Sequence, residues 1–381
     1  MNFELTEDQK MIRDTAREFA QAEVMPSSVE RDINSKFPGD IVKKLGELGF
    51  LGMMVSPEFG GAGLDTICYV LAMIEVSKAD ASVGVIMSVN NSLVCYGLEK
   101  YGSDYIKEKY LIPLAKGEKL GAFALSEPEA GSDATKQKTI ATKDGDFYLL
   151  NGIKNWITNG QSADYVLVMA TTDKDKAHHG ISTLVVEKGM PGFGYGKKED
   201  KMGIRSSDTS SLTFESCKVP VSNLVWEEGK GFNFAMNTLN GGRIGIAAQA
   251  IGIAEASLDA SVKYAKQRKA FGQTIANFQA IQFKIADMAV KVDAAKLLTL
   301  KAAALKDAGK KYYKEAAMAK LYSSKIAVEC ELEAIQIHGG YGYVREYLVE
   351  RYLRDAKITE IYEGTNEIQR IVISRALLDE K

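Results

Sequence analysis

The sequence predicts an α+β protein in which a helical segment, a β-rich segment and a second helical segment follow one another. Three observations predict this order. Amphipathic runs dominate the first third of the chain, short β-rich runs at close spacing follow from about Gly121, and helical periodicity returns after Gly231. Because 381 residues exceed one ordinary core, two or three packed units are expected.

Composition narrows the class of protein. Hydrophobic residues make up 46% of the chain and charged residues 26%, which is typical of a globular protein. The net charge is -2 with acids and bases interspersed, so no basic face for nucleic acid is visible. No stretch of 18 or more apolar residues is expected to span a membrane, and the N-terminus lacks a signal core. A cytoplasmic, bacterial protein is therefore expected.

The cysteines do not form a recognisable motif. All four lie far apart, at Cys68, Cys95, Cys217 and Cys330, without a C-x-x-C pair. This spacing argues against a zinc site or a redox dithiol and favours buried thiols in a reducing compartment.

The first third contains recognisable helix starts. Thr6 can cap the first helix, with Gln9 at the capping-box position. The segment FPGDIVKKLGELGFLGM predicts a helix that begins after Pro38 and ends near Gly49. The glycine-rich PEFGGAGLD, from Pro57, lacks the G-x-G-x-x-G spacing and a preceding strand, so it is not predicted to bind a dinucleotide.

The middle and last thirds differ in periodicity. FYLLNGIKNWITNG, DYVLVMATT, GISTLVVEKG and SSLTFESCKVP predict strands of a small antiparallel barrel or sandwich. Further on, apolar residues recur every three or four positions, which predicts a long bundle helix with one core-facing stripe. The stripe comprises Phe278, Ile281, Ile285, Met288, Val292, Ala295, Leu298, Ala302 and Leu305.

Common catalytic motifs do not occur in the sequence. It has no Walker loop, Rossmann fingerprint, nucleophile elbow or metal-spaced histidine set. Of the three histidines, His178 and His179 adjoin a glycine in an expected loop and should be solvated. His338 precedes two glycines, and this context alone predicts a hydrogen-bonded core histidine rather than a catalytic one.

Two stretches in the β-rich part could contact a ligand. FALSEPEAGSDA, residues 123–134, combines small residues, a proline and hydroxyls, so an anionic or carbonyl-rich ligand could approach its donors. An ordinary turn is the alternative. In NWITNG, residues 155–160, Trp156 and Thr158 would share a strand face with Lys154 and support a flat aromatic ligand. The alternative is a core tryptophan.

Two further stretches lie in the helical C-terminal part. In RKAFGQTIANFQ, Arg268 offers a bidentate fork suited to a diphosphate, although a surface arginine at a helix end is the alternative. In ITEIYEGTNEIQR, Glu363 stands between Tyr362 and Gly364. That acid is either a solvated turn residue or a base held against a substrate.

Together these motifs resemble the acyl-CoA dehydrogenase family over essentially the whole chain. The resemblance rests on SEPEAGSDA, WITNG, GGRIGIAAQAIGIA, QRKAFGQTIANFQ, IQIHGGYGY and IYEGTNEIQR, in the order and spacing of the family. IMSVNNSL and KKEDKMGIRSSDTSSLTFESCKVP are most similar to the short-chain, butyryl-CoA branch.

The resemblance implies a fold and an assembly. It implies a helical N-terminal domain (1–120), a middle antiparallel β-barrel domain (121–228) and a C-terminal four-helix bundle (229–381), assembled as a homotetramer. FAD is expected between the β-domain and the bundle, without a Rossmann fold.

The resemblance also assigns residues to FAD and to substrate. On the flavin side it implies Phe123, Leu125, Ser126, Gly131, Ser132, Trp156, Ile157, Thr158, Thr365 and Glu367. At the diphosphate and adenosine end, of a neighbouring subunit's cofactor, it implies Arg268, Phe271, Gln279, Gln336, His338, Gly339 and Gly340. For the acyl-CoA it implies Ser132, Asn240, Arg243, Tyr362 and Gly364.

Glu363 matches the catalytic base of the family. The α-proton of a thioester is weakly acidic, so its removal needs a base on one face and an electron sink, here the flavin, on the other. The thioester carbonyl is expected to bind the backbone N–H of the base residue, and Gly364 leaves that N–H accessible. One branch of the family places its base at the position that is Gly242 in this chain. Because glycine has no carboxyl group, Glu363 is the only expected base.

Two departures from the family pattern stand out. Asn240 replaces the usual aspartate, which removes a charge near the acyl-CoA. Leu348 stands where a proline is usual, and we expect no structural effect.

The expected reaction is α,β-dehydrogenation of a short acyl-CoA, with electrons passed to an electron-transfer flavoprotein. An alicyclic or branched acyl group is the alternative, with Asn90, Asn91 and Asn240 marking a polar pocket. A glutaryl-CoA enzyme is disfavoured because IMSVNNSLV has no arginine for a distal carboxylate. Two further alternatives are an acyl-CoA oxidase, although the polypeptides of such oxidases are usually much longer, and a nucleic-acid-associated relative that keeps FAD but not turnover.

Overall fold

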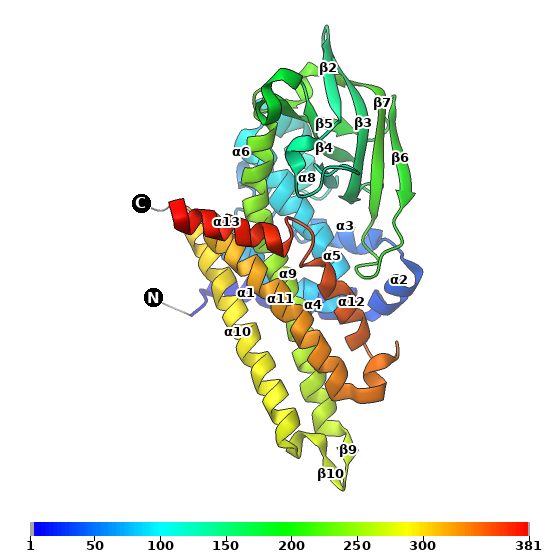
Figure 1. Cartoon of the computed structure of the whole chain (residues 1–381), viewed down its shortest axis with the longest axis vertical. Coiled ribbons are helices and arrows are strands. Elements are labelled where there is room, and N and C mark those ends of the chain that lie inside the picture. Colours follow the sequence, from blue (N-terminus) through cyan, green and yellow to red (C-terminus); the bar gives the residue numbers. More distant parts are fainter. Residues whose placement is uncertain (1–3, 380–381) are drawn as a thin grey trace.

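The computed structural model describes residues 4–379 and consists of three parts in chain order: helices, a β-sheet, and helices again (Figure 1). The α+β order predicted from the sequence is confirmed. The first part contains α1 (Glu7–Phe19), α2 (Ser28–Asn34), α3 (Gly39–Glu47), α4 (Thr66–Ala79), α5 (Ala81–Ser88), α6 (Tyr96–Tyr101), α7 (Asp104–Ile106) and α8 (Ile112–Ala115). Short π or 3₁₀ turns join them at η1 (Ala20–Val24), η2 (Met25–Ser27), η3 (Pro57–Phe59), η4 (Val89–Cys95) and η5 (Lys107–Leu111).

The predicted helix starts are confirmed. The Thr6 side chain accepts a hydrogen bond from the Gln9 N–H, and the Gln9 side chain accepts one from the Thr6 N–H, which completes the capping box of α1. Helix α3 begins at Gly39, directly after Pro38, and ends at Glu47. The glycine-rich segment after Pro57 follows no strand.

The continuous helical segment Ala81–Tyr101 is the one helix of the described residues whose length and composition would suit a membrane span. Its best window has a mean hydropathy of 1.3, so by length and composition it is apolar enough to cross a membrane. However, 94% of that window is buried inside the protein, as in the core helix of a globular fold. Its central π-helical stretch, η4, lies against α9 and β1.

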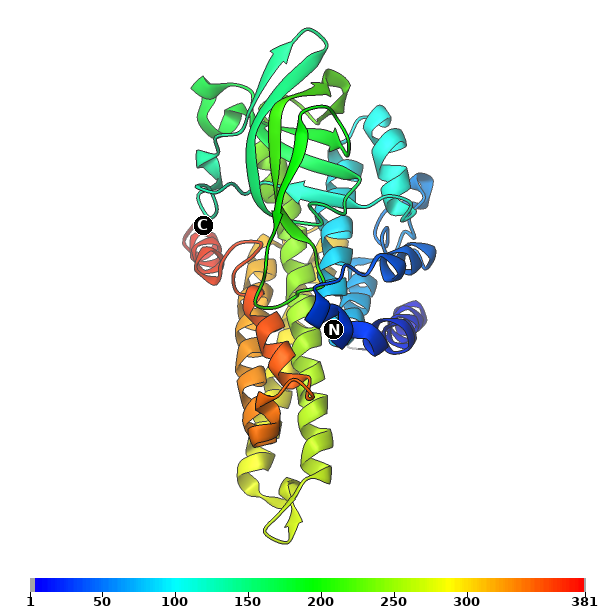
Figure 2. The same ribbon diagram turned by 90° about the vertical axis from the view of Figure 1, so that its right-hand side faces the viewer.

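The middle part is one curled sheet (Figure 2) with the strand order β6-β7-β3-β2-β4-β5-β8, and β1 also pairs with β4. The strands are β1 (Gly121–Ala124), β2 (Ile140–Asp144), β3 (Phe147–Thr158), β4 (Tyr165–Thr171), β5 (Ile181–Glu187), β6 (Phe193–Lys198), β7 (Thr209–Pro220) and β8 (Leu224–Val225). Between strands lie η6 (Ala134–Lys136), η7 (Lys174–Gly180) and η8 (Val221–Asn223).

The sequence predicted an antiparallel sheet, but two of the strand pairs are parallel. Strand β1 runs parallel to β4 from Gly121 opposite Tyr165, and β2 meets the same strand in parallel at Ile140 opposite Thr171. Both strands therefore follow one line along β4, and residues 125–139 leave that line and return to it. This excursion contains most of the FALSEPEAGSDA stretch.

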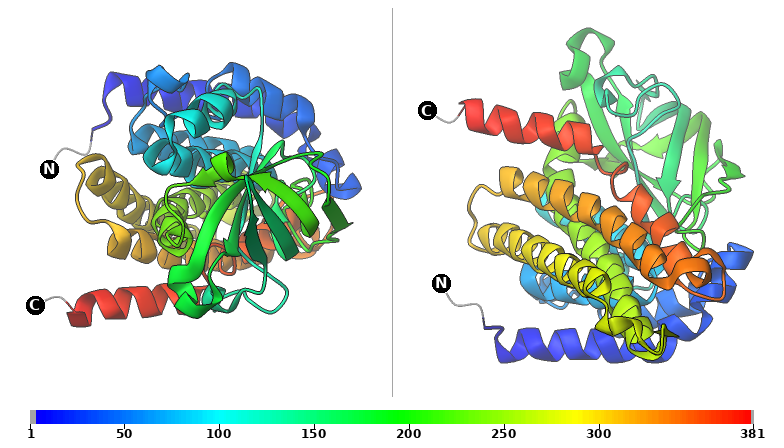
Figure 3. Two further views of the ribbon diagram at one scale, coloured as in Figure 1. Left: turned by 90° about the horizontal axis from the view of Figure 1, so that it is seen from above. Right: turned by 60° about the horizontal axis from the view of Figure 1, so that its bottom comes forward.

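The last part contains α9 (Gly231–Gln267), α10 (Gln279–Asp307), α11 (Tyr313–His338), α12 (Val349–Ile358) and α13 (Asn366–Asp379). Between α9 and α10 lie β9 (Lys269–Ala270), β10 (Gln273–Thr274) and η9 (Ile275–Asn277), and η10 (Gly339–Tyr343) follows α11. Helices α9, α10 and α11 pack along one another, and α13 extends beyond them (Figures 1 and 3). In addition, α4 packs on α9, so the N-terminal helices share this core.

The predicted apolar stripe of α10 faces the core. Met288, Val292, Ala295 and Ala302 are buried, and the other predicted positions are half-buried. On the opposite face of α10, Phe283, Val290 and Leu297 are 63%, 70% and 45% exposed at intervals of two helical turns. A single chain therefore leaves a second apolar stripe of this helix uncovered.

A buried ion pair joins α2 to the junction of α4 and α5. The Arg31 guanidinium lies 2.7 Å from the Asp80 carboxylate, and both side chains are only 5% exposed. Asp80 also caps α5, since it accepts a hydrogen bond of 2.9 Å from the Ser82 N–H. The pair is thus desolvated on both sides and tied to the start of a core helix.

We predict that Arg31→Met lowers the free energy of unfolding by about 3–5 kcal/mol, because it leaves the Asp80 charge buried without a partner. Guanidinium titration checks the value. Lys44→Met is the matched control, since the Lys44–Glu23 pair at 2.6 Å is 47% and 44% exposed and should change stability by about 1 kcal/mol or less. Equal losses in the two variants would contradict this account.

Candidate active site

The loop between α12 and α13 places Glu363 in an unusual backbone conformation. Glu363 has φ +52° and Gly364 has φ +90°. A non-glycine residue in this left-handed region costs about 1–3 kcal/mol and persists only where its surroundings hold it. The residue as a whole is half-buried, but its Oε2 atom is buried and has no hydrogen-bond partner within residues 4–379. Glu363 is therefore not a solvated turn acid.

Burial changes the proton affinity of this carboxyl. Desolvation raises the pKa of Glu363 to about 7, and the positive charges of Lys320 and Arg243 oppose that rise. Near neutral pH the carboxyl is thus present in both protonation states, which is the condition that favours general acid–base catalysis.

Polar side chains of α11 and α13 hold the turn from behind. The Lys320 ammonium donates to the Gly364 carbonyl at 2.9 Å and to Asn366 Oδ1 at 3.1 Å. Gln369 Nε2 donates to the same carbonyl at 2.8 Å. Lys320 is fully buried, and desolvation lowers its pKa to about 7.

The sequence analysis missed Lys320, although a signal was present. Its neighbours at helical spacing are small, and Ala316, Ala317, Ser324 and Ala327 are all buried. A lysine on such a stripe must be buried with them.

The opposite wall is the backbone of α9. A Cβ atom placed on Gly242 would lie 2.1 Å from Glu363 Oε2 and 2.8 Å from Leu93 Cδ2. Only a residue without a side chain lets the carboxylate approach the helix this closely. Gly242 and Glu363, the two positions at which the resemblance places a catalytic base, therefore face one another in this chain.

One turn of α9 holds two of the residues predicted to bind substrate, Asn240 and Arg243. Arg243 is 6% exposed, and its Nη1 donates to Asn240 Oδ1 at 2.7 Å. Burial lowers the pKa of Arg243, and the Glu363 carboxylate opposes that change. Asn240 makes the hydrogen bond to Arg243 that an aspartate could make, but Asn240 carries no negative charge. The positive charge of Arg243 therefore still acts on the Glu363 carboxylate.

Tyr362 lies on the same side of the site. Its hydroxyl donates to Gln249 Oε1 of α9, and Gln249 Nε2 donates to the Ala81 carbonyl at 2.7 Å. This chain of hydrogen bonds fixes the loop residue before Glu363 to two core helices.

Asn90 and Asn91 do not mark a polar pocket. Asn90 donates to the Leu51 carbonyl at 2.8 Å, and Asn91 donates to the Phe50 carbonyl at 2.7 Å and accepts from the Met53 N–H at 2.9 Å. Both side chains are buried and serve to hold residues 50–53. The expectation that they line an unusually polar acyl site is wrong.

The excursion at residues 125–139 is anchored from within the sheet. The buried Lys154 ammonium donates to the Leu125 carbonyl at 3.0 Å, to Glu127 Oε1 at 2.8 Å and to Gln137 Oε1 at 2.9 Å. In addition, the Asn155 N–H donates to the Ser126 carbonyl at 2.9 Å. The loop is therefore a fixed surface and not an ordinary turn.

Trp156 is exposed on that surface. The register of β3 against β7 shifts between Lys154 and Ile157, and Trp156 has φ +62°. As a result Lys154 and Ile157 are buried, whereas Trp156 is 60% exposed. The predicted shared face of Lys154, Trp156 and Thr158 is wrong because of this bulge, and the alternative of a core tryptophan is wrong as well.

The sheet surface and Glu363 meet the same helix. Phe123 of β1 stacks on Phe234 of α9 with ring centroids 6.4 Å apart. Gly242 lies about two turns further along α9, or about 12 Å. The β1 end of the loop and the buried carboxylate are thus neighbours along one rigid element.

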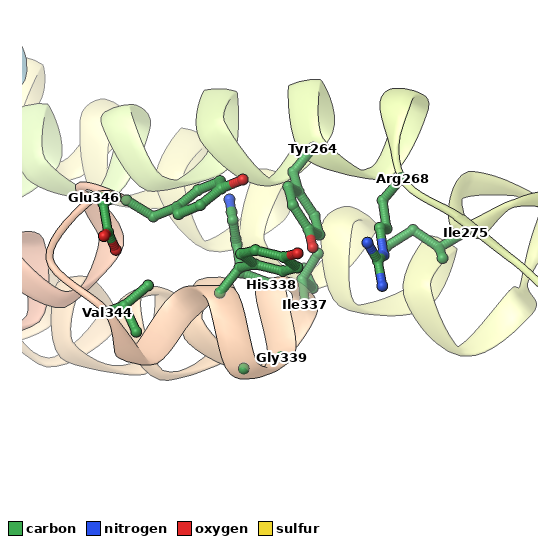
Figure 4. Close-up of a pocket in the computed structure, with 11 residues that line it drawn as sticks. Tyr264, Arg268, Ile275, Ile337, His338, Gly339, Val344 and Glu346 are labelled. Carbon is green, nitrogen blue, oxygen red and sulfur yellow. The ribbon is translucent and has the colours of Figure 1, made fainter.

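A second site lies near the far end of α9. A pocket of about 850 Å³ is lined by Tyr264, Arg268, Ile275, Ile337, His338, Gly339, Gly340, Tyr341, Val344, Glu346 and Tyr347 (Figure 4). The His338 ring stacks on Tyr264 at 4.2 Å, and its Nδ1 lies 2.8 Å from the Ala334 carbonyl, so that nitrogen is the donor. His338 is thus a hydrogen-bonded histidine on the wall of a pocket.

The pocket gathers only part of the residues predicted for one ligand end. Arg268, His338, Gly339 and Gly340 line it, but Gln279 and Gln336 are exposed and do not. Phe271 is 96% exposed in the turn of the β9–β10 hairpin. The sequence analysis missed the aromatic wall of Tyr264, Tyr341 and Tyr347, although Tyr264 precedes Arg268 by one helical turn.

The remaining predicted residues are more exposed. Gly131 and Ser132 are exposed in the excursion, and Glu367 is exposed in the first turn of α13. Thr365 is half-buried, and its hydroxyl accepts from the Ile368 N–H at 3.4 Å. Within residues 4–379 no cluster of three or more histidine, cysteine, aspartate or glutamate side chains could hold a metal ion, and all four cysteines are free and buried.

Family comparisons cover almost the whole chain. Residues 6–118 match the acyl-CoA dehydrogenase N-terminal domain, residues 122–217 its middle domain and residues 229–378 its C-terminal domain.

Individual proteins are similar over the same length. The short-chain-specific acyl-CoA dehydrogenase of Clostridium acetobutylicum is 49% identical over 98% of this chain and 99% of its own. The butyryl-CoA dehydrogenase structure from Megasphaera elsdenii is 49% identical, with a TM-score of 0.98 over 99% of this chain and 100% of that one. A chain in a structure described as the electron transferring flavoprotein of Acidaminococcus fermentans is 52% identical, with a TM-score of 0.99 over 100% of both chains.

The buried carboxyl predicts a pH-dependent effect on stability. Because the folded-state pKa of Glu363, about 7, lies above the unfolded value, the native state binds the extra proton and loses stability as pH rises towards 7. Glu363→Gln should therefore stabilise the protein at pH 8 by about 1–3 kcal/mol, with lost attraction to Lys320 and Arg243 as a partial offset, and should have little effect near pH 4.5. Thermal midpoints at the two pH values check this, and a variant equally stable to the parent at pH 8 contradicts it.

Proposed function

The chain belongs to the acyl-CoA dehydrogenase family, and we propose that it oxidises a short-chain, butyryl-CoA-like thioester to the trans-2-enoyl-CoA with FAD as cofactor and Glu363 as the base. One observation carries the proposal: a carboxylate without a partner is buried against the bare backbone of α9 at Gly242. The names of the short-chain and butyryl-CoA relatives support the acyl length.

The residues present fit a flavin. Trp156 is a large aromatic side chain that is exposed beside a loop fixed by Lys154, so a flat ring has a surface on which to rest. We propose that the flavin side is held by Phe123, Leu125, Ser126, Gly131, Ser132, Trp156, Thr158, Thr365 and Glu367, and by the backbone of the buried Ile157. FAD supplies, when bound, the acceptor for the hydride that leaves the β-carbon of the substrate.

The chain itself supplies the proton acceptor. Glu363 Oε2 has no hydrogen bond to break within the described residues, so the ionised carboxyl can take the α-proton directly. The Glu363 N–H likewise makes no backbone hydrogen bond in residues 4–379, and Gly364 leaves it uncovered. We infer that this N–H polarises the thioester carbonyl, which makes the α-proton more acidic.

The CoA portion would extend along Asn240 and Arg243, with Ser132 and Tyr362 at the acyl end. A branched or alicyclic acyl group loses its main support, because Asn90 and Asn91 are engaged in the core. No observation favours a nucleic-acid-associated role.

We further infer that the enzyme is a homotetramer in which Arg268 serves the cofactor of a neighbour. Tyr264 lies about 22 residues beyond Gly242 on α9, and therefore about 33 Å away. One compact site in a single chain cannot use both. The exposed stripe of Phe283, Val290 and Leu297 and the exposed Phe271 are suited to contacts between copies. Gln279, Gln336, Gly339 and Gly340 would belong to the same cofactor end as Arg268.

We propose an electron-transfer flavoprotein as the acceptor. The support is the similarity to a chain from a structure described as such a flavoprotein.

The cofactor prediction concerns Arg268. The purified protein should be yellow, and Arg268→Ala should weaken FAD binding by about 1.5–3 kcal/mol, or roughly tenfold to a hundredfold, because a bidentate diphosphate contact is lost. Fluorescence titration of the flavin-free protein measures this. Arg345→Ala is the matched control, since Arg345 is exposed and does not line the pocket. A colourless protein that takes up no flavin would overturn the proposal.

The catalytic prediction concerns Glu363. Rapid mixing with butyryl-CoA should bleach the flavin of the parent at a rate that rises with pH through about 7, as the base ionises. Glu363→Gln should still bind the thioester but bleach at least about 10²–10⁴-fold more slowly.

Moving the carboxylate provides the control. Glu363→Gly combined with Gly242→Glu should recover part of the rate, because a side chain at position 242 points at the place that Glu363 Oε2 occupies. If Glu363→Gln alone bleaches within a few-fold of the parent, another residue is the base.

A further inference from the structure

Lys320 is a fully buried charge to which the proposed chemistry gives no role. Among residues 4–379 its ammonium reaches no carboxylate at bonding distance, and its two acceptors there are the Gly364 carbonyl and Asn366 Oδ1. Lys154, the other fully buried lysine of the described residues, differs because Glu127 Oε1 lies 2.8 Å from its ammonium. Neutral acceptors satisfy the hydrogen bonds of an ammonium but do not balance its charge.

Burying such a charge costs several kcal/mol, and an apolar side chain of similar volume would avoid this cost. The cost is reduced by the nearest negative group. For Lys320, burial lowers the pKa, and the attraction of Glu363 is the largest effect in the opposite direction. The unpartnered carboxylate of Glu363 and the unbalanced ammonium of Lys320 therefore compensate one another across the turn.

We propose that Lys320 is the positioning residue of the base: it holds the left-handed Glu363–Gly364 turn through the Gly364 carbonyl, and its positive charge stabilises the ionised Glu363 carboxylate. This inference rests on the proposed function. It assigns Lys320 two separable effects, one on the geometry of the turn and one on the charge of its carboxyl.

Other charged or titratable groups face this pair from each neighbouring element. They are Arg243 from α9, Tyr69 from α4, Tyr362 and Glu360 from the loop, and Glu367 from α13. Arg243 also favours the Glu363 carboxylate, but its guanidinium donates to Asn240 and not to the turn. Lys320 alone among these cations bonds the backbone of the turn in the described residues.

The sign of the effect follows from the charge. Without the Lys320 ammonium, the Glu363 carboxylate loses an attraction, so its pKa rises and the acid limb of flavin reduction moves to higher pH. A role limited to shape would lower the rate by the same factor at every pH. The pH profile therefore separates the two.

The test uses three variants of the flavin-bound enzyme. Lys320→Met removes the charge with similar length, and Lys320→Arg keeps a charge. Ser324→Ala is the matched control, because Ser324 Oγ donates to the same Asn366 Oδ1 at 3.0 Å without bearing a charge. The first readout needs no substrate: infrared titration of the carboxyl band that disappears in Glu363→Gln. The second readout is the pH profile of flavin bleaching by butyryl-CoA.

We expect Lys320→Met to raise the midpoint of the Glu363 band by at least about one pH unit. Bleaching should slow at least tenfold at pH 6.5 but much less at pH 9. Lys320→Arg and Ser324→Ala should leave the midpoint within about 0.3 units of the parent. Amide exchange in residues 362–365 should be faster in Lys320→Met than in Ser324→Ala. An unmoved midpoint in Lys320→Met overturns the inference.

The parent separates this inference from the proposed function. If butyryl-CoA does not bleach the parent flavin, the proposed function fails. If the parent is active but the Glu363 midpoint does not move in Lys320→Met, only the role of Lys320 fails.

If Lys320→Met does not fold, the coupling is measured on Lys320 instead of Glu363. In Glu363→Gln, competitive labelling and peptide mass spectrometry should then show a lower protonation midpoint for Lys320, because coupling between two sites is reciprocal. An equal midpoint there also overturns the inference.

Discussion

The central constraint on this structure is the desolvation of one carboxylate. Water would stabilise the charge of Glu363, so the fold must exclude water and still keep the group able to ionise. Three elements share that task. Helix α9 presents bare backbone at Gly242, α11 contributes Lys320 from behind, and the first turn of α13 contributes Gln369 to hold the Gly364 carbonyl. The strained φ of Glu363 is the local cost of this arrangement.

Other buried charges in the molecule show why this one is different. Arg31 and Asp80 lie 2.7 Å apart, and Lys154 and Glu127 lie 2.8 Å apart, so each charge is balanced by direct contact. Those pairs hold elements in place through direct contact between the two charges. At Glu363 the compensating cations act over a longer distance, and the carboxylate oxygen itself stays free. Ion pairs in direct contact hold structural elements together, whereas a carboxylate whose compensating cations lie further away keeps an oxygen free to accept a proton.

Much of the fold could be predicted because it depends on local patterns. The capping box of α1, the start of α3 and the core stripe of α10 are all periodic or short-range signals, and the structure has them. The parallel pairing of β1 depends on where a distant strand lies, which no local pattern encodes. The exposure of Trp156 depends on a bulge set by the partner strand β7, and alternation along β3 alone predicted the wrong face.

In the candidate site, too, short local patterns predicted some features, whereas contacts between distant segments determined others. Motif order pointed to Glu363 and Arg268, since both stand in short distinctive stretches. The small neighbours of Lys320 indicated its burial, but neither its bond to the Gly364 carbonyl nor the tyrosine wall could be assigned from the sequence, because both arise from contacts between segments far apart in the chain. Asn90 and Asn91 illustrate the converse: these polar residues within η4 looked functional, but the chain folds so that their amides bind the backbone of residues 50–53.

The length of α9 finally connects the chemistry to assembly. This one helix carries the wall of the buried carboxylate at Gly242 and, about 33 Å further on, the Tyr264–Arg268 end of a second pocket. A rigid helix cannot bend to bring these together, and the α9, α10 and α11 bundle stiffens it further. In the proposed homotetramer, the far end of one α9 would lie beside the near end of another, so that the two ends contribute to one cofactor site from different chains. In that proposed assembly, the apolar stripe left uncovered on α10 would provide the surface by which the chains meet.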